Sequence, residues 1–377
     1  MLASLSKPTN DHAQIAPQFG GCNCPLAVAW MLCHVVTSEC VYFTTFKVSS
    51  LRACFGVRDL TGLMRAAVNR DPCVDIDARL SDFHGDLSGL SVESSTISLM
   101  SKIFTRTFRV RWGELDPGGA VSPANYLRYL METAWDWGVA LGWDSKYSEN
   151  PDVFWVIRET DIHFMRPLRH NDEFGLTIWM VNWKGVRGTR CFEVTRKDNG
   201  EVIAQGTQQV VFMDAKTGRP KNLPDEVVNV FRLENPRSFP FERFPKVAPI
   251  ENPFVMQRRV EWMDLDVYGH VNNVIHVNYA EEVAAQEFAA RGWSPARLAE
   301  AGLSVVVKRV HIQYASIAGW GETLRVSTHM LSLHETGGAR YVGIRRADGS
   351  SVAECILDWE LADRQSGEAR SLPAELR

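Results

Sequence analysis

The chain has 377 residues, of which 45% are apolar and 23% are charged, and its formal net charge is −4. These values are typical of an ordinary globular protein with room for more than one core, and they argue against nucleic acid or an anionic membrane as a partner. No apolar run approaches the roughly 20 residues that would cross a bilayer.

Residues 1–103 match no other part of the chain, and three interpretations of them stay open. Six of the eight cysteines lie within the first 73 residues, and the first 58 residues hold only two acidic side chains. Poverty in acids is typical of a targeting leader, but a disordered extension or a misassigned start fits equally well. Cys22 and Cys24 lack the second paired motif of a usual zinc site, so we expect no metal.

The other two cysteines, Cys191 and Cys355, stand far apart in the chain. Isolated cysteines are typical of a reducing compartment. We therefore expect a cytoplasmic protein, or a protein of a plastid or another organelle if residues 1–103 are a leader.

A repeat of 150 residues organises the rest of the chain. Val110–Ala134 and Val260–Ala284 are identical at nine of 25 positions, among them Asp116/Asp266 and Gly119/Gly269. Chance would supply roughly one or two identities, so the chain contains a tandem duplication.

The first copy, expected over residues 104–230, begins with a short strand at Thr107–Trp112 and a glycine-containing loop. A helix follows, because apolar residues such as Leu127, Leu130 and Met131 recur at spacings of three and four. Ser122 is its expected N-cap, with Pro123 at the first helical position. Alternating segments bounded by turn signals then predict an antiparallel meander.

A proline-rich linker is expected over residues 231–253, and the second copy over residues 254–375. The second copy has the same pattern, with a strand at Gln257–Trp262 and a helix that Asn272 would cap. One helix and one meander make an α+β unit, here present twice.

Each copy places an aspartate and a glycine immediately before its long helix. These are Asp116 and Gly119 in the first copy, and Asp266 and Gly269 in the second, where His270 stands beside them. The N–H groups and partial positive charge of a helix N-terminus can polarise a carbonyl group. A nearby carboxylate can act as a nucleophile or as a general base on water, and the sequence leaves both routes open. An aspartate at such a position is also commonly only a helix cap.

These motifs resemble a known family. LDPGGAVSPANYL, from Leu115, is similar to the active-site segment of 4-hydroxybenzoyl-CoA-type thioesterases, and DLDVYGHVNNV, from Asp264, is similar to that of acyl-CoA and acyl-ACP (acyl carrier protein) thioesterases. Two units in one chain most resemble the acyl-ACP enzymes. The resemblance implies tandem hotdog folds, each a long helix wrapped by an antiparallel sheet, with the two copies forming a pseudo-dimer.

The resemblance also implies residue roles. The catalytic carboxylate would be Asp266, the second acid of D-x-D, with His270 four residues on and Asp116 as the counterpart in the first copy. Tyr268 stands where the acyl-ACP branch has asparagine, and a downstream glutamate or cysteine of that branch is missing near Val310.

The expected substrate contacts come from the residues around the catalytic positions. They are the backbone at Gly269 and Val271, the side chains of Asn273 and Tyr268, and, in the first copy, Gly118 and Gly119. The implied reaction is hydrolysis of an acyl-CoA or acyl-ACP thioester to acid and thiol, without metal or organic cofactor. A homodimer of double hotdogs is compatible with this pattern.

Two other functions are alternatives to hydrolysis. A module that binds acyl thioesters without turnover would fit the missing histidine of the first copy and the change to Tyr268. A hotdog hydratase or dehydratase fits less well, because those enzymes have a longer separation between aspartate and histidine than the three residues that lie between Asp266 and His270.

Overall fold

The structure, a computed structural model, describes residues 102–141 and 153–377. The expectations for residues 1–101 therefore lie outside the described part of the chain.

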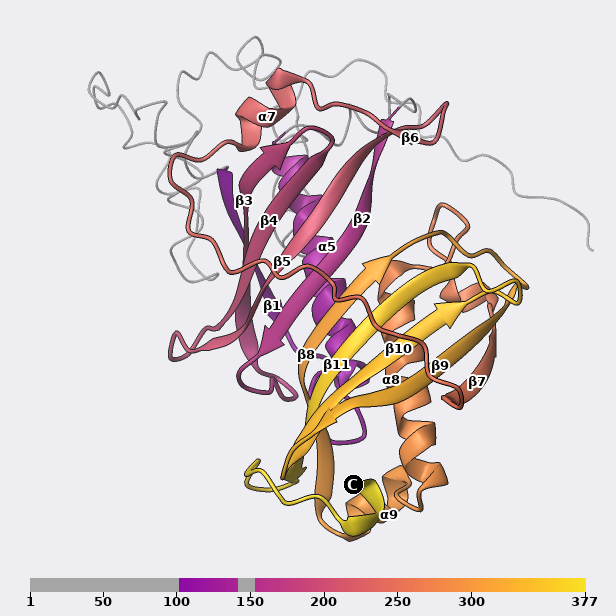
Figure 1. The fold of residues 1–377 in the computed structure, drawn as a ribbon. Coiled ribbons are helices and arrows are strands. Elements are labelled where there is room, and N and C mark those ends of the chain that lie inside the picture. The colour runs from indigo at the N-terminus through magenta and orange to yellow at the C-terminus, as the bar shows by residue number, and fades with distance from the viewer. Residues whose placement is uncertain (1–101, 142–152) are drawn as a thin grey trace, which may run out of the picture. The chain divides into compact units, whose positions relative to one another are not determined.

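The first copy consists of a strand, a long helix and an antiparallel meander (Figure 1). Strand β1 (Ile103–Arg109) leads through a 3-10 turn (Trp112–Glu114) to helix α5 (Pro123–Ala140). The elements that follow are β2 (Val153–Phe164), β3 (Glu173–Lys184), β4 (Arg187–Arg196), β5 (Val202–Asp214), the two-residue β6 (Arg219–Pro220) and helix α7 (Asp225–Phe231).

The second copy repeats this order. Strand β7 (Phe254–Arg259) and a 3-10 turn (Trp262–Asp264) precede helix α8 (Asn273–Ala290). The elements that follow are helix α9 (Pro295–Glu300), β8 (Leu303–Tyr314), β9 (Thr323–Leu333), β10 (Gly337–Arg345), β11 (Ser351–Asp363) and a final 3-10 turn (Ala374–Leu376).

The predicted helix starts are confirmed. Ser122 is the N-cap of α5, with Pro123 at its first position, and the Asn272 side chain accepts a hydrogen bond from the N–H of Val274 at 3.0 Å. The first strand of each copy, however, ends three residues earlier than predicted, at Arg109 and Arg259.

An acidic side chain explains these early strand ends. The carboxylate of Glu114 accepts from the N–H of Arg111 at 2.7 Å, and the carboxylate of Asp264 accepts from the N–H of Glu261 at 2.8 Å. Each bond closes a turn of 3-10 helix, so the backbone leaves the strand before Trp112 and Trp262.

The described strands form one 11-stranded sheet in the order β1-β3-β4-β5-β2-β8-β11-β10-β9-β7, with β6 beside β5. The copies meet where β2 pairs with β8 in antiparallel register, with Asp161 opposite His311. The two copies of the expected pseudo-dimer are thus joined edge to edge in one continuous sheet.

The core lies between the helices and the sheet. Helix α5 packs on β1 and β3, α8 packs on β7, β9 and β11, and the two helices contact each other. Leu130 of α5 and Val277 of α8 belong to one core cluster and are fully buried. Burying such a side chain contributes about 1.5–3 kcal/mol.

Residues 232–253, the linker, cross the sheet on the face away from α5 (Figure 1). In the described part of the chain, the helices fall short of the length and apolar character that a membrane crossing needs.

Candidate active site

The loop before α8 is a tight turn held by its own backbone. The N–H of Asp266 donates to the carbonyl of His270 at 2.9 Å, and the N–H of Gly269 donates to the carbonyl of Asp266 at 3.0 Å. Gly269 has φ +78°, a conformation that side chains other than glycine rarely adopt. This glycine therefore lets the chain turn back and brings residues 266 and 270 together.

The turn assembles three of the residues that the sequence singled out. Asp266 Oδ2 lies 3.3 Å from Nδ1 of His270, and its Oδ1 accepts from the N–H of Tyr268 at 2.9 Å. The Tyr268 and His270 rings stack with centroids 6.0 Å apart. The side chains of Asp266 and His270 are 19% and 30% exposed, so a carboxylate–imidazole pair is accessible from solvent.

The backbone donors of this loop differ from those expected. The N–H of Val271 donates to the carbonyl of Ala318 at 2.8 Å, and that of Gly269 is engaged within the turn. Both groups thus position the loop. The N–H of His270, between them, has no acceptor among the described residues and is the better placed donor for a substrate oxygen.

Asn273 is the first residue of α8, and its carbonyl accepts from the hydroxyl of Tyr314 at 3.1 Å. His276, one turn into the helix, is buried, and burial lowers its pKa to about 4, against the effect of the backbone around Asn272. His276 is therefore neutral at pH 7 and packs within the core rather than acting beside Asp266.

The loop before α5 has the same turn but a more enclosed carboxylate. Asp116 Oδ1 accepts from the N–H of Ala120 at 3.1 Å, and Gly119 has φ +83°. Burial raises the pKa of Asp116, although the N–H groups of residues 118–120 and the charge of Arg169 act in the opposite direction. A pKa above the ordinary range makes this carboxylate a stronger base than an exposed aspartate.

The second copy covers this first loop. A Cβ placed at Gly118 would lie 3.5 Å from the Cβ of Ser304, at the start of β8, and 3.0 Å from Asp116 Oδ1. Arg364, which follows β11, donates from Nη2 to the carbonyl of Pro117 at 2.7 Å. A side chain at position 118 would therefore crowd the carboxylate of Asp116 and come into van der Waals contact with the second copy.

Glu281 of α8 is a residue that the sequence reasoning missed. Burial, together with the charge of Asp116, raises the pKa of Glu281 to about 8, while a hydrogen bond from the N–H of Ala124 lowers it. Ala124 lies in the first turn of α5, so a carboxyl group of the second copy faces the aspartate and helix start of the first.

Comparison of the two copies does not single out Glu281, because the corresponding residue of α5 is Met131 and not an acid. One feature of the sequence could have identified Glu281 as unusual. It is a charged residue four positions after Val277, on the apolar face of the helix. Glu132 and Glu282, which do recur, have local surface partners: Glu132 accepts from Arg106 at 3.2 Å and Glu282 from Gln286 at 2.7 Å.

His311, near the position where the acyl-ACP branch would have a further acid or thiol, has a different role. Its Nε2 lies 2.7 Å from Oε1 of Glu159 across the junction of β2 and β8. Both side chains are buried, so they belong to the joint between the copies. In the described part of the chain, no group of three or more His, Cys, Asp or Glu side chains is placed to hold a metal ion.

Comparison with known proteins gives the family. The model of the thioesterase-like superfamily matches the chain twice, at residues 110–231 and 260–377. The protein belongs to the thioesterase-like superfamily. The family to which the sequence motifs pointed is therefore confirmed.

Among known relatives of this thioesterase-like protein is a chloroplastic dodecanoyl-[acyl-carrier-protein] hydrolase of Cinnamomum camphora. The two are 26% identical over 197 residues, which are 48% of this chain and 50% of the relative. The chain thus spans about half the length of that relative.

Solved structures share the fold. The 12:0-ACP thioesterase from Umbellularia californica matches with a TM-score of 0.58 and 20% identity, over 69% of this chain and 98% of that one. An acyl-ACP thioesterase from Bacteroides thetaiotaomicron matches with a TM-score of 0.57 and 17% identity, over the same shares. The predicted tandem hotdog architecture is confirmed.

Proposed function

We propose that this thioesterase-like protein hydrolyses acyl thioesters of acyl carrier protein or coenzyme A, releasing the acid and the thiol. The observation that carries the proposal is the accessible Asp266–His270 pair, 3.3 Å apart, at the start of helix α8. The names of the relatives, which act on acyl-carrier-protein thioesters, favour the carrier-bound substrate.

Hydrolysis requires an attacking oxygen, a polarised carbonyl and a proton for the leaving thiolate. The Asp266 carboxylate supplies the oxygen as a nucleophile or activates water as a general base. The N–H of His270 and the positive end of α8 stabilise the oxyanion. The His270 imidazole orients the carboxylate, and in its protonated form it can donate a proton to the leaving sulfur.

The first copy provides a second candidate centre with a different proton donor. Asp116 occupies the position of Asp266, and Glu281 from the opposite copy takes the place of the missing histidine. Because its pKa is about 8, Glu281 is mostly protonated at pH 7 and can donate a hydrogen bond, while Asp116 remains a base. Gly118 and Gly119 would then position the substrate against the start of α5.

Thiol release tests the proposal. Wild type, Asp266→Asn, Asp116→Asn and the double variant would be assayed with acyl-CoA and acyl-ACP substrates of different chain length. Asp198→Asn, an exposed turn position, is the matched control. The proposal expects the double variant to lose turnover of every substrate that the wild type cleaves.

Two results would count against hydrolysis. Substrate-dependent stabilisation of the wild type without thiol release would favour the binding module instead. Full activity of the double variant would place the chemistry elsewhere in the chain.

A second proposal concerns the cell compartment in which the protein is located. The Cinnamomum relative is chloroplastic, and the first 58 residues of this chain hold only two acidic side chains, so we propose a plastid or similar organelle ahead of the cytoplasm. Expression of the full chain with a C-terminal fluorescent tag would distinguish the two locations.

A further inference from the structure

A row of polar side chains crosses the face of the sheet that carries the linker. The row joins five strands, because the pairs Asn182–Thr189, Thr189–Gln209, Gln209–Glu159 and Glu159–Gln313 are each directly opposed on neighbouring strands. Directly opposed residues point to the same side of a sheet. The row therefore runs from the first copy into the second without interruption.

The linker is fixed on both sides of this row. At one end, the Trp179 indole donates to the carbonyl of Arg237 at 2.6 Å, and Arg237 pairs with Glu193 at 2.9 Å. At the other end, Glu242 pairs with Arg309 at 2.8 Å. A segment held at two points can keep an open space beneath it instead of collapsing onto the strands.

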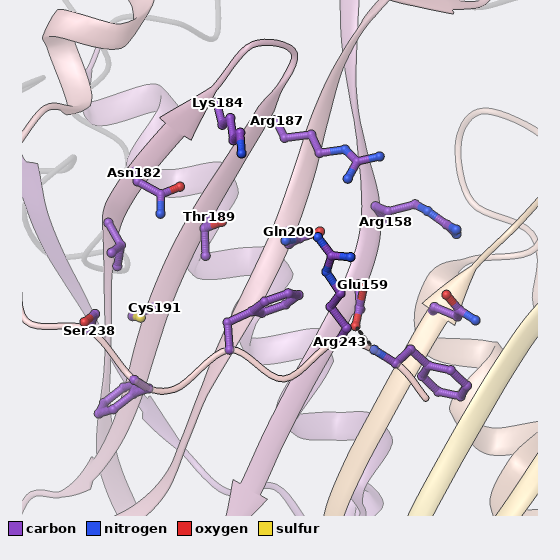
Figure 2. Close-up of a pocket in the computed structure, with 15 residues that line it drawn as sticks. Arg158, Glu159, Asn182, Lys184, Arg187, Thr189, Cys191, Gln209, Ser238 and Arg243 are labelled. Atoms are coloured by element: carbon purple, nitrogen blue, oxygen red, sulfur yellow. Dashed lines mark hydrogen bonds between the residues drawn. The ribbon is translucent and has the colours of Figure 1, made fainter. Parts of the chain in front are cut away.

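A cavity of ≈ 660 Å³ lies between the row and the linker. We call it the linker cavity. It is lined by the polar row, by Phe239, Phe241 and Phe244 of the linker, and by a set of basic side chains (Figure 2). Its volume lies within the roughly 300–1,000 Å³ that is typical of small-molecule sites.

The charge of the linker cavity is strongly positive. Arg158, Lys184, Arg187 and Arg243 line it, against a single carboxylate. That carboxylate, Glu159, is already occupied, since its Oε1 accepts from the N–H of Phe244 at 3.0 Å and lies 2.7 Å from His311.

Three of the four cations are available to a ligand. Arg158 donates to the carbonyl of Tyr314, whereas Lys184, Arg187 and Arg243 form no ion pair with any described carboxylate. Guanidinium groups bind phosphate through two parallel hydrogen bonds, and an ammonium group adds charge without that geometry. A concave site with three unpaired cations is therefore suited to a phosphorylated ligand.

We propose that the linker cavity binds a nucleoside phosphate, with its phosphates on Lys184, Arg187 and Arg243 and its base among the linker phenylalanines. The amide and hydroxyl groups of the row supply further hydrogen bonds to base and ribose. The cavity includes no residue of the loops that precede α5 and α8, so its residues are distinct from those proposed for hydrolysis. A protein is a less suitable ligand for this cavity, because the three phenylalanines of the linker line the cavity instead of forming an open surface.

The test measures binding of defined probes to the full chain by calorimetry: ADP, adenosine 3′,5′-bisphosphate, coenzyme A and inorganic pyrophosphate. Arg187→Ser combined with Arg243→Ser should weaken each of them about a hundredfold, roughly tenfold for each charged contact. Arg219→Ser, an exposed arginine outside the cavity, should leave binding unchanged. Phe241→Ala should weaken the nucleotides but not pyrophosphate.

Two sources of the nucleotide are distinguished by the same titrations. Similar affinities for ADP and coenzyme A would indicate a free nucleotide as the ligand, and a strong preference for coenzyme A would indicate the nucleotide end of a substrate. An unchanged melting temperature of the double arginine variant would show that its loss of binding is not a loss of fold.

Three results would overturn the proposal. The first is no binding of any phosphorylated probe at millimolar concentration. The second is binding that the double arginine variant does not weaken. The third is that the variant binds the four small probes normally and loses affinity only for acyl carrier protein, titrated as a fifth probe. Because Asp266→Asn leaves the cavity intact, its binding of ADP separates failure of this proposal from failure of the proposed hydrolysis.

Discussion

Arg309 and Asp161 join the two copies by a double hydrogen bond, with Nε to Oδ1 and Nη2 to Oδ2 both at 2.8 Å. Arg309 belongs to β8 and Asp161 to β2, and their side chains are 18% and 3% exposed. Such a planar pair fixes direction as well as distance. It therefore helps to fix the register in which the two halves of the sheet meet.

Replacing Arg309 should destabilise the protein strongly. Arg309→Leu leaves the buried Asp161 without its main counter-charge, and removal of one partner of a buried pair typically costs about 3–5 kcal/mol. We expect a loss of about 3 kcal/mol in urea unfolding of the full chain. Arg166→Leu, which breaks the exposed pair of Arg166 with Glu201, is the control and should cost about 1 kcal/mol or less. Equal losses would mean that the joint is held by backbone pairing alone.

The same pair predicts a dependence of stability on pH. Burial by itself would raise the pKa of Asp161, but hydrogen bonds from His163 and Arg309, with the charge of His311, lower it to about 2. Because the folded pKa lies below the ordinary value of 3.8, the stabilisation is complete above pH 4 and is lost as the pH falls towards 2. The loss should be about 2 kcal/mol. Thermal unfolding of Asp161→Asn should lack this part of the acid dependence.

In the loop before α8, removal of the Asp266 carboxylate should slow the chemical step. Asp266→Asn is expected to lower kcat by about a hundred- to ten-thousandfold with little change in melting temperature, because its hydrogen bond from Tyr268 can still form. His270→Ala should lower kcat by roughly tenfold or more and alter the pH profile. A fall in stability that accounts for the lost activity would argue for a structural role instead.

Features that depend only on residues close together in the chain were predictable from the sequence. Asp266, Gly269 and His270 are brought together by a five-residue turn, so their proximity needs no knowledge of the rest of the fold. The helix caps at Ser122 and Asn272 and the repeated strand–helix order are local in the same sense. Tertiary contacts, such as the hydrogen bond from Val271 to Ala318, place the loop in the fold but are not needed to infer that these residues are close together.

Features that depend on how strands and copies meet were not predictable. The register of β2 shifts between Ile157 and Glu159, and that of β3 shifts between Met180 and Asn182. These irregularities break the simple alternation of faces, so the polar row could not be found by counting. The role of Glu281 was not predictable for a related reason. Its partner Asp116 lies in the other copy, so their proximity depends on how the two copies pack.

Glu281 should make the protein less stable at high pH. Its folded pKa of about 8 lies above the ordinary 4.5, so its protonated form stabilises the fold below pH 4.5 and this contribution disappears as the pH rises through 8. Glu281→Gln should therefore raise stability at pH 9 by on the order of 2 kcal/mol and change it little at pH 4. Glu282→Gln, one residue along on the surface, is the matched control. Stabilisation by both substitutions would indicate a general charge effect on α8.

Arg190 and Arg340 occupy corresponding positions of the two copies but have different partners. Arg340 is 1% exposed and pairs with the buried Glu287 at 2.9 Å, whereas Arg190 donates to the neutral side chain of Gln208. Arg340→Met should cost about 3 kcal/mol, because it leaves Oε2 of the buried Glu287 without its partner, and the carboxylate keeps only Arg291, 2.6 Å from its Oε1, as a counter-charge.

Adding Glu287→Leu to Arg340→Met should restore most of that stability, since replacing both members of a buried pair by apolar groups is often close to neutral. The measurement is a double-mutant cycle in urea, with Arg345→Met as the control for a more exposed pair, that with Glu354. A double variant as unstable as the sum of the single variants would show that the two groups stabilise the core independently. Recovery would show that the energetic cost lies in the unbalanced charge that remains when one partner is removed. Arg190, whose partner among the described residues is the neutral Gln208, should then be replaced by Met at a smaller cost than Arg340.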